Sequence, residues 1–269
     1  MNTFFLDRLN SEPHALAFAG QSTPWPVTLA DQSANPVLDE ALHTHADAAQ
    51  ALLYPVSADL LATTGRPVDL FGFEPNPARL GAAAAASASV PGIALAQLGA
   101  LLDAASLGYN PAVAKPVAVL GHSQGVLAVH MVQAIVEAGS IEAASAQIDE
   151  ILAIATLIGV AGTRQARQLG LAARHGEATP MLSVKDITRA QVDALIKRVS
   201  GARGPIAVAV TNSATHYVLS GYPEDLAAFG VEVAKEHKHQ AKLREEKVRG
   251  GRVFEPVLEY LDVTLPFHS

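Results

Sequence analysis

The fold is best approached from Val117-Ala-Val-Leu-Gly121-His122-Ser123-Gln124-Gly125, where a strand pattern meets a helix pattern through a Gly-x-Ser-x-Gly turn. A short run of β-formers precedes the turn, and apolar residues recur at helical spacing over Val126–Gly139. This context predicts a nucleophile elbow, a tight strand-to-helix turn that exposes the Ser123 hydroxyl. Gly121 and Gly125 fit the prediction, because a side chain at either place would collide with the neighbouring strand or helix.

The position of Ser123 also suits acyl-transfer chemistry. Ser123 lies at the predicted helix N-terminus, where free N–H groups and the helix dipole favour developing negative charge. The tetrahedral intermediate of acyl transfer carries an oxyanion, and elbow geometry alone predicts that the N–H of the next residue, Gln124, donates to it. A glycine-bounded turn without catalysis is the alternative, and the flanking strand and helix argue against it. We interpret Ser123 as a nucleophile.

Composition limits the classes of protein that this chain can be. Its 269 residues are 49% hydrophobic and 17% charged, which provides a substantial core and excludes extensive disorder. The net charge of −7 and the absence of a basic patch with interleaved aromatics argue against a nucleic-acid partner. The chain has no cysteine, so disulfides, thiolate metal sites and a cysteine nucleophile are excluded, and a reducing cytoplasm fits.

The sequence gives no metal site, signal peptide or membrane span. We interpret His43 and His45 as a solvated surface pair, because no third ligand lies nearby. The run Gly81–Ser89 is interrupted by Pro91-Gly92, and the apolar run Ile151–Val160 is too short to cross a bilayer. The N-terminus lacks a basic region followed by a long apolar stretch.

The first part of the chain has the order of an α/β domain. Ala15–Gly20 is an apolar strand candidate, and a loop rich in turn residues follows over 21–26. Helical spacing then predicts helices over Val37–Val56, Gly92–Leu107, Val126–Gly139 and Ile141–Leu169. With the strand before the elbow, these segments predict an α/β domain with a mostly parallel sheet over residues 1–176.

After Gly176 the pattern changes. Alternation predicts strands over Met181–Lys185, Ile206–Thr211 and Tyr217–Ser220, the last two joined by a turn at Asn212–Thr215. Helices are predicted over Arg189–Val199, behind the capping box Thr188-x-x-Gln191, and from Pro223 to about His237, with Lys235–Arg252 as a solvated helix end and loop. With one further strand this order predicts a ferredoxin-like subdomain over 177–262. Residues 263–269 are expected to return to the core.

Motifs along most of the chain resemble one family. They are Phe18-Ala-Gly-Gln21, Ser89-Val-Pro-Gly-Ile-Ala-Leu-Ala-Gln97-Leu, Gly121-His-Ser-Gln-Gly125, Ile158-Gly-Val160, Thr179-Pro-Met-Leu-Ser183, Thr211-Asn212 to Ser220-Gly221, and Pro266-Phe-His-Ser269. In this order they resemble the acyl-CoA:acyl-carrier-protein transacylases, in particular the acetyltransferase domain of type I fatty acid synthases of the fungal β-subunit and fused actinobacterial kinds. The resemblance implies an α/β-hydrolase-like acyltransferase core with an inserted ferredoxin-like subdomain.

The resemblance also implies the roles of individual residues. Ser123 would attack the thioester of acetyl-CoA while His268, the histidine in a matching motif, takes its proton as general base. The acyl group would then pass to the phosphopantetheine thiol of an acyl carrier protein. The oxyanion hole would be formed by the backbone N–H groups of Gln21 and Gln124, and His122, Ile158 and Asn212 would bind substrate. Gln21 and Asn212 also fit ordinary turn residues.

Ile158 bears on the choice of acyl group. Malonyl-selective members of the family carry an arginine at this position, whose guanidinium pairs with the malonyl carboxylate. Isoleucine would leave that charge unpaired, so the sequence favours acetyl or another uncharged acyl group. Arg164 and Arg167 lie further along the same helix, and Ile158 as a plain core residue is the alternative.

The resemblance extends to partners and location. It implies no permanently bound cofactor, a coenzyme A thioester as substrate, the carrier domain and other synthase domains as partners, a large homo-oligomer and a cytoplasmic location. In the family, further segments follow the Pro-Phe-His-Ser motif and a downstream carbonyl orients the imidazole. The chain ends at Ser269, so we expect a truncated piece of a larger synthase that is weakly active or inactive alone.

Other interpretations remain open. A malonyl or palmitoyl transferase of the same synthase would share these motifs. A Gly-x-Ser-x-Gly esterase would need an acid and then a histidine after the serine, and Asp262 and His268 have that order. The predicted ferredoxin-like insert argues against a hydrolase. A non-catalytic synthase fragment would fit the apolar composition.

Overall fold

The computed structural model describes residues 8–20, 24–64, 70–71, 86–171, 178–199, 204–245, 254–261 and 263–268. Contacts between residues divide the chain into two units, Met1–Gln165 and Ala166–Ser269. We describe each unit by itself. The predicted domain boundary after residue 176 lies close to this division, whereas residues 263–269 fall in the second unit by contacts.

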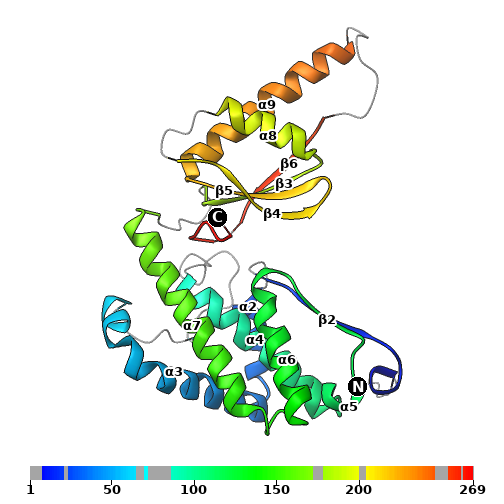
Figure 1. Cartoon of the computed structure of the whole chain (residues 1–269), viewed down its shortest axis with the longest axis vertical. Coiled ribbons are helices and arrows are strands. Elements are labelled where there is room, and N and C mark those ends of the chain that lie inside the picture. Colours follow the sequence, from blue (N-terminus) through cyan, green and yellow to red (C-terminus); the bar gives the residue numbers. More distant parts are fainter. Residues whose placement is uncertain are drawn as a thin grey trace. The chain divides into compact units, whose positions relative to one another are not determined.

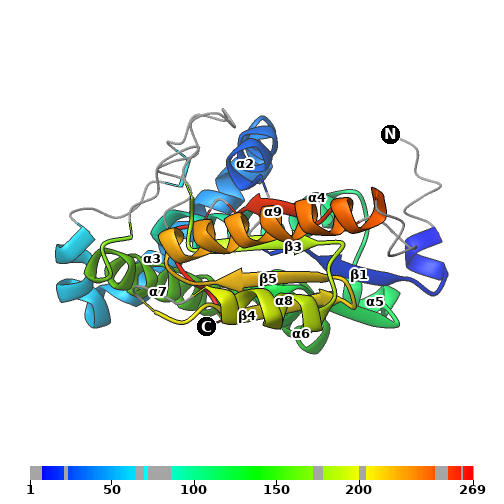
Figure 2. The same ribbon diagram turned by 90° about the horizontal axis from the view of Figure 1, so that it is seen from above.

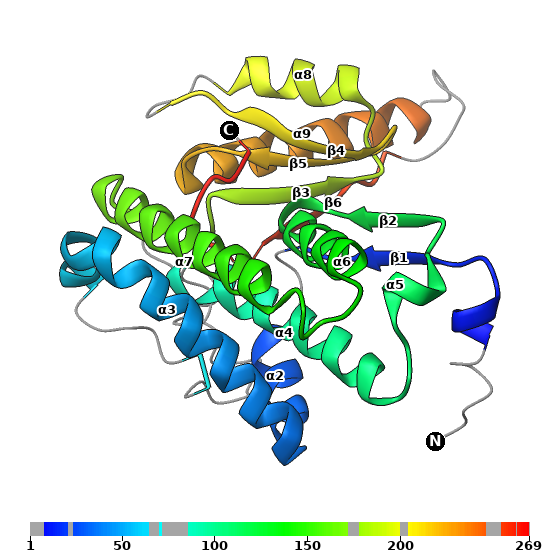
Figure 3. The ribbon, with the colours of Figure 1, turned by 60° about the horizontal axis from the view of Figure 1, so that its bottom comes forward.

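The first unit contains a parallel pair of strands, as the sequence predicts. β1 (Ala15–Phe18) pairs in parallel with β2 (Ala118–Gly121), and Phe18 lies opposite Gly121 at their ends. The helix α6 (Val126–Ala138) packs on both strands, as Figure 3 shows. The register brings the chain that leaves β1 next to the chain that leaves β2. The parallel pair confirms the α/β class.

A buried helix, α4 (Ala86–Ser106), organises the rest of the first unit. It contacts α2 (Trp25–Ser33), α3 (Pro36–Thr64) and α6, and most of its residues are buried. The remaining helices are α5 (Pro111–Ala114) and α7 (Ser145–Gln168), which continues past the boundary of the unit. Figure 1 shows α3 beside α4.

Two predictions about this region are wrong. The segment 21–26 is not all loop, because α2 begins at Trp25, with Pro24 at its N-cap and a proline in its first turn. The helix predicted to begin at Gly92 begins at Ala86, so that Pro91 and Gly92 lie inside α4. Packing explains the second case: a Cβ at Gly92 would lie 2.5 Å from the Trp25 ring, so the ring occupies the space that glycine leaves.

The arguments from length against a membrane span also fail. Among the described residues, α4 and α7 are both long and apolar enough to cross a bilayer. The most apolar window of α4 is 72% buried inside the protein, as in the core helix of a soluble domain, and that of α7 is 33% buried. Length and composition are weak evidence, so the absence of a membrane partner stays a prediction.

The second unit is a four-stranded antiparallel sheet with two helices. Its elements run β3 (Met181–Lys185), α8 (Arg189–Arg198), β4 (Ala207–Ser213), β5 (His216–Ser220), α9 (Pro223–Glu245) and β6 (Val257–Tyr260). The strand order is β4-β5-β3-β6. This is the βαββαβ arrangement of a ferredoxin-like unit, and Figures 1 and 2 show α8 and α9 on the same face of the sheet. The predicted ferredoxin-like subdomain is confirmed.

Alternate residues of β3 build two apolar clusters. Leu182 and Val184 face α8 and α9 and join the main core, which includes Phe229 of α9. Met181 belongs to a second cluster with Val263. Burial raises the pKa of Tyr260, which packs against the main core.

Two details of the second unit correct the sequence analysis. Helix α9 extends to Glu245, well into the charged run that was expected to be a helix end and loop. Hydrogen bonds from Gln240 and Arg198 lower the pKa of Glu236, which lies in the same charged run. The turn before β5 is formed by Ala214 and Thr215, so Asn212 lies in β4 and not in the turn.

Candidate active site

Ser123 lies in the tight turn that its sequence context predicts. β2 ends at Gly121, His122 is extended, and the single turn Ser123–Gly125 leads directly into α6. Ser123 has a φ of 53°, in the left-handed region that residues other than glycine rarely adopt. Such strain persists where the surrounding structure holds it, and it concentrates at functional sites.

The two glycines of the motif are required by packing. A Cβ at Gly121 would lie 2.5 Å from the backbone of Gly125 and Val126, and one at Gly125 would run into the carbonyl oxygen of Phe18. The backbone N–H of His122 donates to the same Phe18 oxygen over 2.9 Å, and that of Gly125 donates to the His122 oxygen over 2.9 Å. The steric role expected for these glycines is confirmed.

The chain that leaves β1 also lies against the elbow. A Cβ at Gly20 would be 2.8 Å from the carbonyl oxygen of His122 and 3.1 Å from the Cβ of Ser123. Gln21, the predicted first donor of the oxyanion hole, lies outside the described residues. The second predicted donor, the N–H of Gln124, belongs to the turn itself, and the Gln124 side chain donates to the carbonyl oxygen of Val90 in α4.

The first unit holds Ser123 and two of the residues predicted to bind substrate, His122 and Ile158. His122 is exposed and Ser123 is half-buried at the turn. Ile158 lies on α7 with 45% of its surface exposed, so the alternative that it is a plain core residue is wrong. The next residue, Gly159, packs so closely on α4 that a Cβ there would meet the carbonyl oxygen of Ala86.

His268 belongs to the second unit. The segment that carries it is anchored by Val263 and Phe267, which pack in the second apolar cluster of the sheet. His268 itself is exposed and has a φ of 62°. Because Ser123 and His268 lie in different units, the catalytic pair stays a prediction.

Asn212 is part of a polar group that the sequence analysis did not find. Its Nδ2 lies 3.4 Å from Nε2 of His216 in the adjacent strand, and the same Nε2 lies 3.1 Å from the hydroxyl oxygen of Ser183. Ser183 is 3% exposed. The signal in the sequence was the alternation of β3 and β5, which places Ser183 and His216 on the same face of the sheet.

One of the two histidines of α3, which were expected at the surface, is buried. His45 is buried, and its Nδ1 lies 2.6 Å from a carboxylate oxygen of Asp149 in α7. His43 stacks on Phe71 with ring centres 3.6 Å apart. The surface interpretation is confirmed for His43, which is exposed, and is wrong for His45. Over the described ranges, no three histidine or carboxylate side chains come together as a metal site would require.

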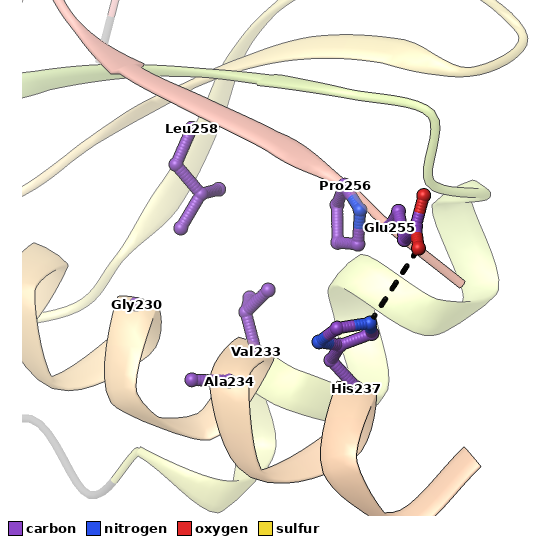
Figure 4. Close-up of a pocket in the computed structure, with 7 residues that line it drawn as sticks. All are labelled: Gly230, Val233, Ala234, His237, Glu255, Pro256 and Leu258. Carbon is purple, nitrogen blue, oxygen red and sulfur yellow. Dashed lines mark ion pairs between the residues drawn. The ribbon is translucent and has the colours of Figure 1, made fainter. Parts of the chain in front are cut away.

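A pocket of about 360 Å³ lies within the second unit, between α9 and β6. Val233 and Ala234 of α9 face Leu258 of β6 across it, and His237 forms an ion pair of 3.9 Å with Glu255 at its rim, as Figure 4 shows. Residues predicted for catalysis or substrate binding are not among those that line it. The pocket therefore adds nothing to the catalytic hypothesis.

The fold and the elbow together define an α/β protein with a serine in a tight strand-to-helix turn and a ferredoxin-like unit. Residues 180–260, within that unit, match the family model described as the fatty acid synthase central AT domain. Over 164 residues the chain is 27% identical to the fatty acid synthase beta subunit hexB of Dothistroma septosporum, and the match covers 56% of this chain and 8% of that protein.

Solved structures agree on the fold. The malonyl CoA-acyl carrier protein transacylase of Coxiella burnetii matches with a TM-score of 0.54 and 18% identity, over 95% of this chain and 63% of that one. The acyltransferase domain from the second module of the salinomycin polyketide synthase matches with a TM-score of 0.51 and 20% identity, over 96% and 46%. Together with the sequence matches, these support an acyltransferase domain of the fatty acid synthase type, as the motifs indicated.

Proposed function

We propose that this chain is an acyltransferase that moves an acetyl or other uncharged acyl group from coenzyme A to Ser123 and then to the phosphopantetheine thiol of an acyl carrier protein. The observation that carries the proposal is the backbone of Ser123, held at a positive φ between Gly121 and the start of α6. In a nucleophile elbow this geometry exposes the serine hydroxyl and places the N–H of the next residue where it can donate to an oxyanion.

The chemistry follows from these groups. The Ser123 oxygen attacks the thioester carbonyl while His268 accepts the hydroxyl proton, and the N–H of Gln124 stabilises the resulting oxyanion, with that of Gln21 as the second donor. Collapse of the intermediate breaks the C–S bond, and the proton leaves with the coenzyme A thiol. The carrier thiol then attacks the acyl-serine, and its proton returns to Ser123 by the same route.

Ile158 supports an uncharged acyl group. Its exposed aliphatic side chain supplies no partner for a carboxylate, and a desolvated, unpaired malonyl charge would cost several kcal/mol, on the order of the ionic penalties in protein interiors. Malonyl transfer is the second candidate, because similar structures include malonyl transacylases. Arg164 and Arg167, further along α7 and both exposed, are the candidates to accept the carboxylate in that case.

The setting is proposed from the same resemblance. The curated relative is a fatty acid synthase subunit, so we propose that the chain works beside the carrier and other catalytic domains of such a synthase. The chain spans under a tenth of that relative's length. We further propose a cytoplasmic location and assembly into a large homo-oligomer.

A transfer assay tests the proposed function. The chain is incubated with labelled acetyl-CoA and a holo-acyl carrier protein, and label is measured on the carrier and in free acetate. We expect label on the carrier that is lost in Ser123→Ala. Free acetate without labelled carrier would instead indicate an esterase, and no turnover with either acceptor would favour a non-catalytic fragment.

A further inference from the structure

Gln97 is a buried polar residue on an apolar helix, and its side chain makes a hydrogen bond to the segment that follows β1. It lies on the buried helix α4 and is 7% exposed. Its Nε2 donates to the carbonyl oxygen of Ala19 over 2.6 Å. A carbonyl oxygen only accepts, so the amide nitrogen, and not the amide oxygen, must face Ala19.

Ala19 lies where the chain leaves β1 for the elbow. The next residue, Gly20, is in close contact with His122 and Ser123. A Cβ at Gly125 would lie 2.9 Å from the Ala19 oxygen, so this carbonyl is wedged between Gln97 and the elbow glycine. The residue that follows Gly20 in the sequence is Gln21, the proposed first donor of the oxyanion hole.

A second glutamine joins the elbow to the same helix. The side chain of Gln124 donates to the carbonyl oxygen of Val90, whose position in α4 lies about two turns before Gln97. Helix α4 is thus bonded to both segments that would supply the oxyanion hole, one through its own side chain and one through its backbone.

The amide of Gln97 is costly in this place. Its Oε1 is buried and has no hydrogen-bond partner in the part of the chain that the structure describes. An unpaired buried polar atom is destabilising, whereas an apolar side chain of similar size would fill the position without that cost. The Oε1 of Gln32 is buried in the same way, so the feature that sets Gln97 apart is the Ala19 carbonyl to which its Nε2 donates.

We propose that Gln97 is a positioning residue for the oxyanion hole, with the Gln124 side chain as its counterpart on the elbow. The proposal rests on the proposed acyl transfer at Ser123. Gln97 does not touch substrate. It holds the Ala19–Gly20 segment against the elbow that carries Ser123 and the N–H of Gln124.

The test replaces Gln97 by methionine, which keeps the length of the side chain and removes the donor. Growth of the acetyl adduct on Ser123 is followed over time at increasing acetyl-CoA. We expect the limiting rate to fall about tenfold to a hundredfold, because misaligned oxyanion donors lose much of their effect. The acetyl-CoA concentration at half-maximal rate should change less than twofold. Affinity for phenylboronic acid, which forms a tetrahedral adduct on serine, should fall with the rate.

Gln32→Met is the matched control. Gln32 also donates its Nε2 to a backbone carbonyl, that of Ala96 in α4, over 2.9 Å, but this carbonyl belongs to the helix and not to the elbow segments. The control should lose similar thermal stability and keep the limiting rate. Equal rate losses in both variants would overturn the proposal, since they would reflect general destabilisation of α4.

Gln124→Met tests the proposal independently if Gln97→Met does not fold. We expect the same drop in the limiting rate of Ser123 acetylation from this variant. Wild-type rates in the variant that folds would overturn the proposal while the function at Ser123 stands. If the wild-type chain forms no adduct on Ser123, the proposed function fails first, and the role of Gln97 fails with it.

Discussion

At the scale of single residues, Gly125 connects the folding of the elbow with its chemistry. The missing side chain lets the turn approach the carbonyl oxygens of Phe18 and Ala19. Backbone oxygens cannot move aside as the end of a flexible side chain can. The contact therefore holds the Ser123 turn against the end of β1, and even one added methyl group should separate them.

Gly125→Ala tests this contact. We expect a loss of about 2–3 kcal/mol of unfolding free energy in the first unit, typical of an overpacked core. The rate of Ser123 acylation should also fall under conditions in which the variant is still folded. Chemical denaturation and the rate of Ser123 acylation measure the two effects. Gly139→Ala, a helix-end glycine with nothing within 4 Å of an added Cβ but a φ of 89°, is the comparison. Normal acylation by Gly125→Ala would contradict the role given to the contact.

Ile158→Arg tests the selectivity argument. A guanidinium at this exposed position on α7 can pair with a carboxylate, so the ratio of malonyl to acetyl transfer should rise at least tenfold. Rates of Ser123 labelling from the two thioesters give the ratio. Ile158→Met, which adds no charge, should leave it unchanged. An unchanged ratio in Ile158→Arg would mean that this position does not face the acyl group.

Residue patterns predicted the elbow better than they predicted polar contacts. The glycines and serine carry a steric signal within five positions of sequence, and the structure agrees with it. The contacts of His45 with Asp149 and of His216 with Ser183 join segments far apart in the chain. Alternation within a strand assigns Ser183 and His216 to a face of the sheet, but spacing within one segment does not identify the partner in another segment.

At the scale of elements, local signals decided where helices begin, and tertiary packing decided where they continue. The capping box of α8 forms as predicted, with the Thr188 hydroxyl accepting from the Gln191 N–H and the Gln191 side chain accepting from the Thr188 N–H. Helix α4 continues through Pro91 because its surroundings are buried and Trp25 packs on Gly92. The residues around Pro91 in the sequence do not predict that the Trp25 ring packs on this part of the helix.

Thr188→Ala tests the cap. We expect a loss of about 1 kcal/mol of unfolding free energy, because one donor of the first helical turn loses its partner. Denaturation followed by circular dichroism measures it. Thr188→Ser keeps the hydroxyl and should restore most of the loss. Equal stability of the alanine and serine variants would show that the bond contributes nothing.

At the scale of the whole molecule, the ferredoxin-like unit was predictable and the division of the chain less so. Its strands alternate clearly, and the order β-α-β-β-α-β leaves few ways to bury two helices on one face. The division at Gln165 falls inside α7, where the sequence shows no break. The pairing of Ser123 with His268 depends on the arrangement of both units, which no local pattern contains.

The most direct test of the account is the intact mass of the chain after incubation with acetyl-CoA, followed by peptide mapping. The account predicts one acetyl group on Ser123, absent in Ser123→Ala and released when a pantetheine thiol is added. An acetyl group on another residue, an adduct that survives in Ser123→Ala, or an unmodified wild-type chain would contradict it.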